Sequence, residues 1–224
     1  MTLRSPDPVV APAVPSTPAQ HGRRDRILEC ATAILAAGGE DALQMKELAQ
    51  RADVSLATLY RYFPAKDHVL IAITLSRYER ALARVRQEPA RPGTIRERVT
   101  AHLLREFRAA QREPLLTAAL SRVVGETSRS YSTVIEQIED AHLRVVRHVA
   151  AAGGRLSPAQ DAVLPVVVDV LAAASRRWLA GTSSPARARF EIRLGGRLLD
   201  LPGELPDEEP WPAAPPAASE QAPG

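Results

Sequence analysis

The segment from Met45 to Lys66, MKELAQRADVSLATLYRYFPAK, restricts the possible folds of this chain more than any other feature. Its apolar residues recur at helical spacing in two short stretches, Met45–Ala52 and Leu56–Phe63, with only residues 53–55 between them. Two helices joined by so short a turn must cross at a steep angle and share one small core. The segment therefore predicts a helix-turn-helix unit.

Three residues mark the limits of these two helices. Ser55 stands where the N-cap of the second helix is expected to accept a hydrogen bond from an early amide. Asp53 occupies a turn position that often requires a positive φ, a conformation that Asp tolerates better than most side chains. Pro64 restricts the residue before it, so the second helix is expected to end at Phe63.

The second helix has one face suited to packing and another suited to DNA. Leu59 and Phe63 lie four residues apart and are expected to face inward. This leaves Ala57, Thr58 and Arg61 for the major groove of DNA. A guanidinium pairs with both acceptors of a guanine, which is worth ~1–3 kcal/mol of discrimination, and a Thr or Ala methyl contacts thymine. The pattern is typical of a recognition helix.

Hydroxyl and ammonium groups near this face fit phosphate oxygens, which fix the register on DNA without carrying sequence information. Tyr60, Tyr62 and Ser55 supply hydroxyls, and the only lysines of the chain, Lys46 and Lys66, flank the unit. An alternative stays open for the tyrosines as core-edge residues and for the cations as surface charges. The predicted DNA-contacting residues are Lys46, Ser55, Ala57, Thr58, Tyr60, Arg61, Tyr62 and Lys66.

The remainder of the chain also has helical periodicity, so we predict an all-α fold. Residues 1–20 and the acidic segment 201–224 contain many prolines and few large apolar residues, which predicts disorder. Arg23 and Arg24 either enter a minor groove from the end of the first segment or form a solvated helix start. Pro165 either kinks its helix or marks a later start. The predicted helices outside the helix-turn-helix are Arg23–Ala37, Lys66–Gln87, Thr94–Gln111, Pro114–Val124, Ser128–Ala152, Pro158–Ala180 and Pro185–Leu199.

The residues quoted above resemble the DNA-binding signature of the TetR family of one-component repressors. The resemblance runs over residues 23–73 and includes QMKELAQRADVS and ATLYRYFPAKDHVL. Residues 38–54 and 111–122 also resemble a narrower branch, the KstR-like repressors of sterol catabolism. Asp53 departs mildly from the family, which usually has Gly at this place in the turn.

The resemblance implies an Ω-shaped all-α homodimer that binds a palindromic operator on double-stranded DNA. It divides the chain into a disordered arm (1–20), a three-helix DNA-binding domain with the helix-turn-helix (21–66), a helical ligand-binding and dimerisation domain (67–200) and a disordered acidic tail (201–224). It also implies a repressor that leaves the operator when a ligand fills a cavity in the larger domain. An activator remains an alternative, because the sign of regulation depends on the position of the operator.

Apolar positions on the later helices are candidates for this cavity and for the dimer interface, although core packing within one chain explains them as well. Few charges fall on these faces, so the expected ligand is apolar or amphipathic, such as a steroid or an acyl-CoA thioester, with Arg105, Arg108 or Arg112 available to an anionic tail. The cavity candidates are Leu104, Phe107, Leu120, Val124, Tyr131, Ile135 and Trp178. The interface candidates are Val170, Ala174, Phe190, Leu194 and Leu198.

Other classes of protein find little support. Cys30 is the only cysteine, which excludes an internal disulfide or a Cys-based zinc site, and no metal or cofactor is expected. No HExxH, GxSxG or phosphate-binding glycine loop occurs, so we do not expect an enzyme. No apolar run reaches the ~18 residues of a membrane span, and the start does not resemble a secretory signal, so we expect a cytoplasmic protein. The remaining alternative is a helical small-molecule or partner-binding protein whose helix-turn-helix does not engage DNA.

Overall fold

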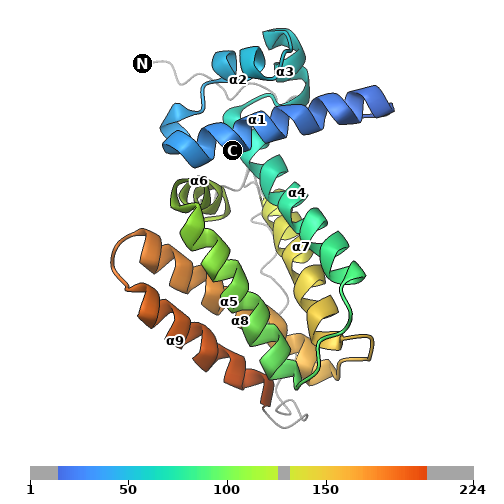
Figure 1. Ribbon diagram of the computed structural model, residues 1–224, viewed down its shortest axis with the longest axis vertical. Helices are drawn as coiled ribbons and strands as arrows, with labels where there is room; N and C mark the ends of the chain where they lie inside the picture. The colour runs from blue at the N-terminus through green and yellow to red at the C-terminus, as the bar shows by residue number, and fades with distance from the viewer. Residues whose placement is uncertain (1–14, 126–131, 201–224) are drawn as a thin grey trace, which may run out of the picture.

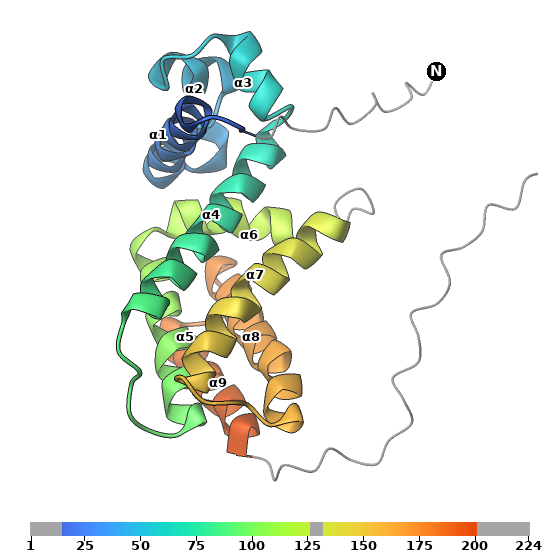
Figure 2. The ribbon, with the colours of Figure 1, turned by 90° about the vertical axis from the view of Figure 1, so that its right-hand side faces the viewer.

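The computed structural model describes residues 15–125 and 132–200, and their regular secondary structure is helical throughout, with no β-strand (Figure 1). The first three helices form a small body, and α4 leads from it into a larger body built by the remaining helices (Figures 1 and 2). The helices are α1 (Pro18–Ala42), α2 (Met45–Arg51), α3 (Leu56–Tyr62), α4 (Lys66–Gln87), α5 (Ile95–Arg112), α6 (Pro114–Gly125), α7 (Ser132–Ala151), α8 (Pro158–Leu179), α9 (Pro185–Gly196) and the 3₁₀ helix η2 (Arg197–Asp200).

Two apolar cores hold these helices together. The first lies among α1–α4 and also takes in residues of α6 and α7, including Leu116 and Ile138. The second lies among α5, α7, α8 and α9 and is centred on residues such as Phe107 and Leu164. Because the first core includes α6, the helix-turn-helix body does not close on itself. It is packed directly against a helix of the larger body.

The first helix begins earlier than the sequence predicted. It starts at Pro18, because Thr17 accepts a hydrogen bond from the Gln20 amide at 3.3 Å and Pro18 stands at the first helical position. Residues 18–20 are therefore helical, and their predicted disorder is wrong. Residues 15–17 are described and precede the helix, with Thr17 as its N-cap. The prediction for residues 1–14 lies outside the described residues, as does that for the acidic tail. At the other end, Gly39 has a φ of 71°, which interrupts the helix two residues after its predicted end at Ala37.

The later helices agree with their predicted ranges to within a few residues at each end where they are described. A capping box at Ser157 and Gln160 starts α8, and the helix continues through Pro165 to Leu179. Pro165 therefore does not delimit the helix. Within the described residues, no helix combines the length and the apolar character that a membrane crossing requires.

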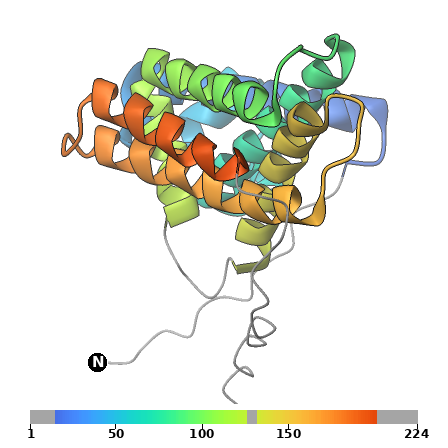
Figure 3. The ribbon, with the colours of Figure 1, turned by 90° about the horizontal axis from the view of Figure 1, so that it is seen from below.

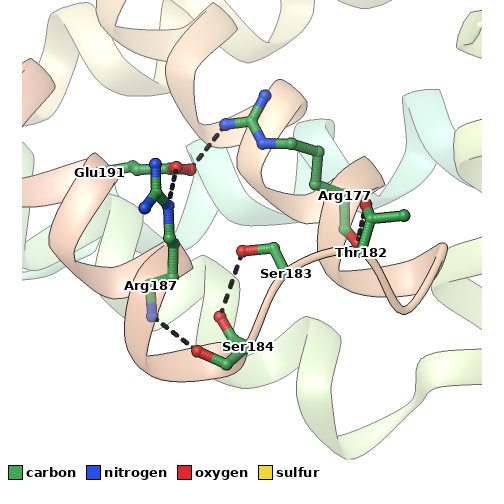
Figure 4. Close-up of polar contacts among 6 residues, drawn as sticks. All are labelled: Arg177, Thr182, Ser183, Ser184, Arg187 and Glu191. Carbon is green, nitrogen blue, oxygen red and sulfur yellow. Dashed lines mark hydrogen bonds and ion pairs between the residues drawn. The ribbon is translucent and has the colours of Figure 1, made fainter.

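Helices α8 and α9 form an antiparallel pair along one side of the larger body (Figures 1 and 3). The turn between them is fixed by Glu191, whose carboxylate accepts from Arg177 at 2.6 Å and from Arg187 at 3.0 Å (Figure 4). These bonds from Arg177 and Arg187 hold the pKa of Glu191 below its ordinary value. Ser184 caps α9 by accepting from the Arg187 amide at 3.1 Å.

Candidate functional site

The inward face of α3 is packed as its sequence predicted. Leu59 is fully buried and Phe63 is 2% exposed, and both join the first core together with Leu48 and Ala49 of α2. The turn before α3 has the predicted geometry, since Asp53 has a φ of 52°. A rigid base of this kind fixes the direction in which the opposite face of the helix points.

The outward face of α3 carries the residues that the sequence nominated for DNA. Ala57 and Arg61 are exposed, Tyr60 is 44% exposed and Thr58 is half-buried. Ser55 caps α3, because its hydroxyl oxygen accepts from the Thr58 amide at 3.1 Å. Its hydroxyl also donates to the Thr58 hydroxyl at 2.9 Å, which leaves the Thr58 hydrogen available to a ligand.

Three residues on or near this face were missed or left open by the sequence. Leu56 is an exposed apolar residue at the first position of α3, next to Ala57, and is suited to an apolar contact with a base. Lys46 is exposed on the first turn of α2. Arg24 does not belong to a flexible arm: it lies within α1, with its guanidinium 5.9 Å from the centre of the Phe63 ring.

The outward orientation predicted for Tyr62 is wrong. Only 3% of this residue is exposed, and its ring centre lies 6.3 Å from that of Phe63 within the first core. The reason is helical spacing, because Tyr62 follows Leu59 by three positions and so falls on the packed stripe. Tyr62 contacts the outward face of α3 only indirectly, through the Arg61 guanidinium, which lies 5.6 Å from the centre of the Tyr62 ring.

Lys66 has a structural contact in addition to its predicted role. It is half-buried at the first position of α4, and its ammonium donates to the Glu40 carbonyl at 3.2 Å, near the broken end of α1. An ammonium has three hydrogens, so this bond leaves others for a phosphate. The contact fixes the start of α4 against the helix-turn-helix body.

A cavity of about 510 Å³ lies within the larger body, between α4, α5, α6, α7 and α8. Phe107 and Leu120, two of the predicted cavity residues, are among its walls. The described residues that line it are Thr74, Arg77, Tyr78, Arg80, Ala81, Arg84, Glu106, Phe107, Ala109, Ala110, Thr117, Leu120, Ser121, His142, Leu171, Ala172, Ser175 and Arg176.

The other predicted cavity residues lie elsewhere. Leu104 and Trp178 pack against the second core, and the Trp178 ring meets Phe107 edge to face at 5.5 Å, so they support the cavity from behind. Ile135 is half-buried on α7 and does not line the cavity. The predictions for Val124 and Tyr131 concern side chains that lie outside the described part of the structure.

A half-buried carboxylate held between two buried histidines forms part of the cavity wall. The Glu106 carboxylate lies between two histidines, 3.0 Å from His102 Nε2 and 2.9 Å from His142 Nε2. A carboxylate only accepts hydrogen bonds, so His142 Nε2 carries the hydrogen that it donates to Glu106. His102 Nε2 lies close to the carboxylate but is not aligned as a hydrogen bond. Burial alone would raise the pKa of Glu106, but the contacts with His142 and His102 hold it well below its ordinary value. Glu106 is therefore an ionised anchor for both rings.

Tyr78 is positioned by this group. Its ring stacks on His142 with 4.6 Å between the ring centres. Burial first, and then the charge of Glu106, raise the pKa of Tyr78, so its hydroxyl remains a donor. Among the described residues this hydroxyl has no hydrogen-bond partner. It is thus available to a polar atom of a ligand in the cavity.

The cavity is also strongly basic on one side, contrary to the expectation that few charges would intrude. Arg77, Arg80 and Arg84 follow one another at helical spacing on α4, and Arg176 joins them from α8. Of these four, only Arg77 has an ion-pair partner within the described residues, Glu113 at 3.3 Å. The spacing of the α4 arginines was visible in the sequence, but nothing there showed which face of α4 meets the cavity. Arg105, Arg108 and Arg112, named for this role, do not line it.

Helix α6 connects the cavity with the helix-turn-helix body. Three of its residues, Thr117, Leu120 and Ser121, line the cavity. Its Arg122 donates from Nε to Glu40 at 2.6 Å and from Nη2 to Asp67 at 2.7 Å, so one side chain joins α1, α4 and α6. A ligand that moves α6 therefore acts on the body that carries α3. No pattern in the sequence predicts this contact, because its partners are far apart in the chain.

The outer face of the α8–α9 pair is apolar. Phe190, Leu194 and Val166 are 62%, 52% and 50% exposed, and Val170 and Leu198 beside them are half-buried. Ala174, also predicted for this face, is fully buried in the second core. It falls on the inward stripe of α8 with Val167 and Leu171, so its assignment to the interface is wrong.

Residues 27–73 match the family described as bacterial regulatory proteins, tetR family. The chain is 36% identical to the HTH-type transcriptional repressor KstR of Rhodococcus jostii (strain RHA1), over 186 residues that cover 82% of this chain and 85% of the relative. It is 32% identical to KstR of Mycobacterium tuberculosis, over 85% of this chain and 86% of the relative. These relatives extend the likeness well beyond the helix-turn-helix.

Solved structures show the same arrangement of helices. A TetR transcriptional regulator from Rhodococcus sp. RHA1 has a TM-score of 0.72 at 25% identity, over 82% of this chain and 98% of that one. Thermus thermophilus FadR, a TetR-family repressor in complex with lauroyl-CoA, has a TM-score of 0.62 at 22% identity, over 85% of this chain and 100% of that one. The predicted all-α fold, with an N-terminal helix-turn-helix and a helical C-terminal body, is confirmed.

Proposed function

Since this chain belongs to the TetR family of bacterial regulatory proteins and is a regulator of the KstR type, we propose that it holds a palindromic operator as a homodimer and leaves it when an effector fills the cavity. The class of protein is a ligand-responsive, DNA-binding transcriptional repressor. The observation that carries the proposal is the outward face of α3, which is polar and basic above a buried apolar base. This role requires binding and release but no catalysis, and it places the protein in the cytoplasm with the chromosome.

We assign direct contacts with bases to Ala57, Thr58 and Arg61, with Arg61 on a guanine. Contacts with phosphate oxygens fall to Tyr60, which is exposed beside them, and to the hydroxyl of Ser55. The ammonium groups of Lys46 and Lys66 supply further phosphate contacts at the edges of the unit. In this assignment residues 21–66 form the DNA-binding domain and residues 67–200 the regulatory domain.

The second subunit is needed for geometry as well as for affinity. One α3 helix reads one major groove, and a palindromic operator presents the next half-site ~34–36 Å away. The exposed apolar face of Phe190, Leu194 and Val166 is self-complementary across a two-fold axis, where it would form a four-helix interface.

The effector that fits the cavity is amphipathic with an anionic part. Its apolar body would lie against Phe107, Leu120 and Leu171, and a volume of about 510 Å³ is within the range of small-molecule pockets. The arginines on α4 and α8 suit phosphate or carboxylate groups. An acyl-CoA thioester, with a fatty-acyl or steroid body, satisfies both requirements. The complex of FadR with lauroyl-CoA gives a precedent for this class of ligand in the same fold.

The test measures binding of the full chain to the DNA upstream of its own gene by fluorescence anisotropy at moderate salt. We expect tight, sequence-dependent binding that lauroyl-CoA or a steroid-CoA thioester weakens. Arg61→Ala should lose affinity unevenly across operator variants, by about 10-fold at the base pair that it reads. The same protein should bind non-specific DNA almost as well as the unmodified chain. If no fragment of the upstream region is bound, the chain is instead a helical small-molecule or partner-binding protein.

A further inference from the structure

A second, smaller pocket lies at the end of the larger body farthest from the helix-turn-helix. We call it the lower pocket. It has a volume of about 230 Å³ and is formed where α4 ends, where α7 ends and along one side of α5 (Figures 1 and 2). Its lining is Val85, Arg86, Glu88, Pro89, Ala90, Arg91, Arg98, Arg105, His148, Val149, Ala152 and Gly153.

The walls of the lower pocket carry a large excess of positive charge. Four arginines line it, Arg86, Arg91, Arg98 and Arg105, and the only carboxylate among the lining residues is Glu88. That carboxylate is 3.5 Å from Arg91 in an exposed pair. Neither Arg86 nor Arg105 has a carboxylate partner within residues 15–125 and 132–200.

One of the four arginines has a structural role that accounts for its position. Arg98 donates to the carbonyls of Val149, at 3.2 Å, and Ala150, at 2.6 Å, and to that of Gly93. It therefore closes the last turn of α7 and ties it to the loop before α5. No such bond to backbone carbonyls accounts for Arg86, Arg91 or Arg105 among the described residues.

Helix dipoles do not neutralise the excess. Two helix ends, those of α4 and α7, reach the pocket, and each presents the equivalent of about −0.5 charge. Together with Glu88 they offset about two of the four arginines, which leaves roughly +2. The pocket is thus more basic than packing against two helix ends requires.

The positive charge around the lower pocket acts on the Arg105 guanidinium. Arg105 is half-buried, and its one side-chain hydrogen-bond contact among the described residues is with His102 Nδ1, at 3.5 Å. Burial, and then the charge of Arg91, lower the pKa of Arg105. The charges of Glu88 and Glu106 oppose the effect of its cationic neighbours only in part. A cation held next to other cations, partly out of water, is stabilised by an anion between them.

We propose that the lower pocket binds a phosphate-type dianion between Arg86, Arg91 and Arg105. The three arginines line the pocket from α4, from the loop after it and from α5. A guanidinium group offers forked donors, which suit the oxygens of a phosphate or pyrophosphate group. The volume accommodates an inorganic anion or the phosphate end of a larger ligand. The site is separate from the cavity assigned to the effector, because the two share no lining residue.

The experiment is isothermal titration calorimetry of the full chain, at low ionic strength, with inorganic pyrophosphate in one arm and ADP in the other. We expect one site per chain. Tighter binding of pyrophosphate identifies a free anion as the preferred ligand, whereas tighter binding of ADP identifies a phosphate carried on a larger molecule. Arg105→Gln and Arg86→Gln should each weaken binding about tenfold or more, because each removes a charge-assisted contact.

The matched control is the double variant Arg61→Ala/Arg80→Gln, because the proposed DNA-reading face and the effector cavity are the other basic sites that attract anions. This variant should bind pyrophosphate within about twofold of the unmodified chain, since it leaves all three proposed anion contacts in place. The proposal fails if neither anion binds, or if the double variant Arg61→Ala/Arg80→Gln removes binding that Arg105→Gln and Arg86→Gln retain. A melting curve without anion gives a second check. Arg105→Gln should melt no lower than the unmodified chain, because it relieves repulsion, and a lower melting temperature with unchanged anion affinity would show a purely structural role.

Discussion

The contact most open to a quantitative test is that of Arg122, which joins the cavity helix α6 to Glu40 and Asp67. The substitution Arg122→Gln keeps a side chain of similar length and removes the charge. It leaves two carboxylates, 26% and 31% exposed at their side chains, without the cation that holds them together. The first core, which crosses the same junction, remains intact.

The size of the effect follows from these exposures. A hydrogen bond to a charged group contributes about 1.5–3 kcal/mol when well buried, and exposed ion pairs contribute about 0–1 kcal/mol. With partners roughly one-third exposed, about 1 kcal/mol for each bond is appropriate, so the free energy of unfolding should fall by about 2 kcal/mol. For a chain of this size that corresponds to a melting temperature lower by about 4–8 °C.

Urea denaturation followed by circular dichroism measures this loss directly. The matched control is Arg144→Gln, which breaks an exposed pair with Asp140 whose side chains are 53% and 55% exposed, and should cost less than about 0.5 kcal/mol. Arg122→Gln should also reduce the factor by which lauroyl-CoA changes operator affinity, because α6 then moves without pulling on α1 and α4. Equal losses for the two variants, with an unchanged response to lauroyl-CoA, would refute a role for Arg122 in transmission.

Three further predictions follow from the site. Tyr60→Phe should weaken operator binding several-fold in fluorescence anisotropy, whereas Tyr62→Phe should leave it within about twofold, because only the first hydroxyl is on the exposed face. Phe190→Glu should convert the dimer to a monomer in light scattering and lower operator affinity about 100-fold or more; a dimer that persists would contradict the proposed interface. Glu106→Gln should lower the free energy of unfolding at neutral pH, as measured by urea denaturation. Because the folded-state pKa of Glu106 is depressed, the difference from the unmodified chain should shrink as the pH falls below about 4.5, the ordinary pKa of a Glu side chain. A difference that grows instead would contradict the role of Glu106 as an ionised anchor.

The local structure of the helix-turn-helix could be predicted from sequence because its determinants are close together in the chain. Ser55 caps the helix that follows it, Asp53 adopts the positive φ of the turn, and Leu59 and Phe63 pack as their spacing requires. The prediction that Tyr62 faces outward is wrong because it rests on the chemistry of the hydroxyl and not on the position of the residue along the helix. Helical spacing placed it with Leu59, and the apolar ring has enough surface to favour burial.

The assignment of residues to the cavity was less successful for a physical reason. An apolar residue on a helix of the larger body can face the cavity, the second core or the outer face of the α8–α9 pair, and these differ by small rotations of the helix. Trp178 and Leu104 pack against the second core, and Ala174 lies on the inward stripe of α8. Periodicity shows that such a stripe is buried but does not show what it is buried against.

The polar wall of the cavity shows why apolar patterning alone underestimates a ligand site. Glu106 and His102 share one helix at a spacing of four residues, but His142 comes from a helix that is distant in sequence, and only the fold brings the three together. A carboxylate half-buried in this way is tolerated because His142 donates to it and His102 lies 3.0 Å from it. In this protein the Glu106–His142 contact positions the His142 ring, on which the Tyr78 ring stacks. The Tyr78 hydroxyl is then free to donate to a ligand in the cavity. Selectivity for the effector would then depend on a polar atom within reach of Tyr78, and the apolar walls would contribute mainly to affinity.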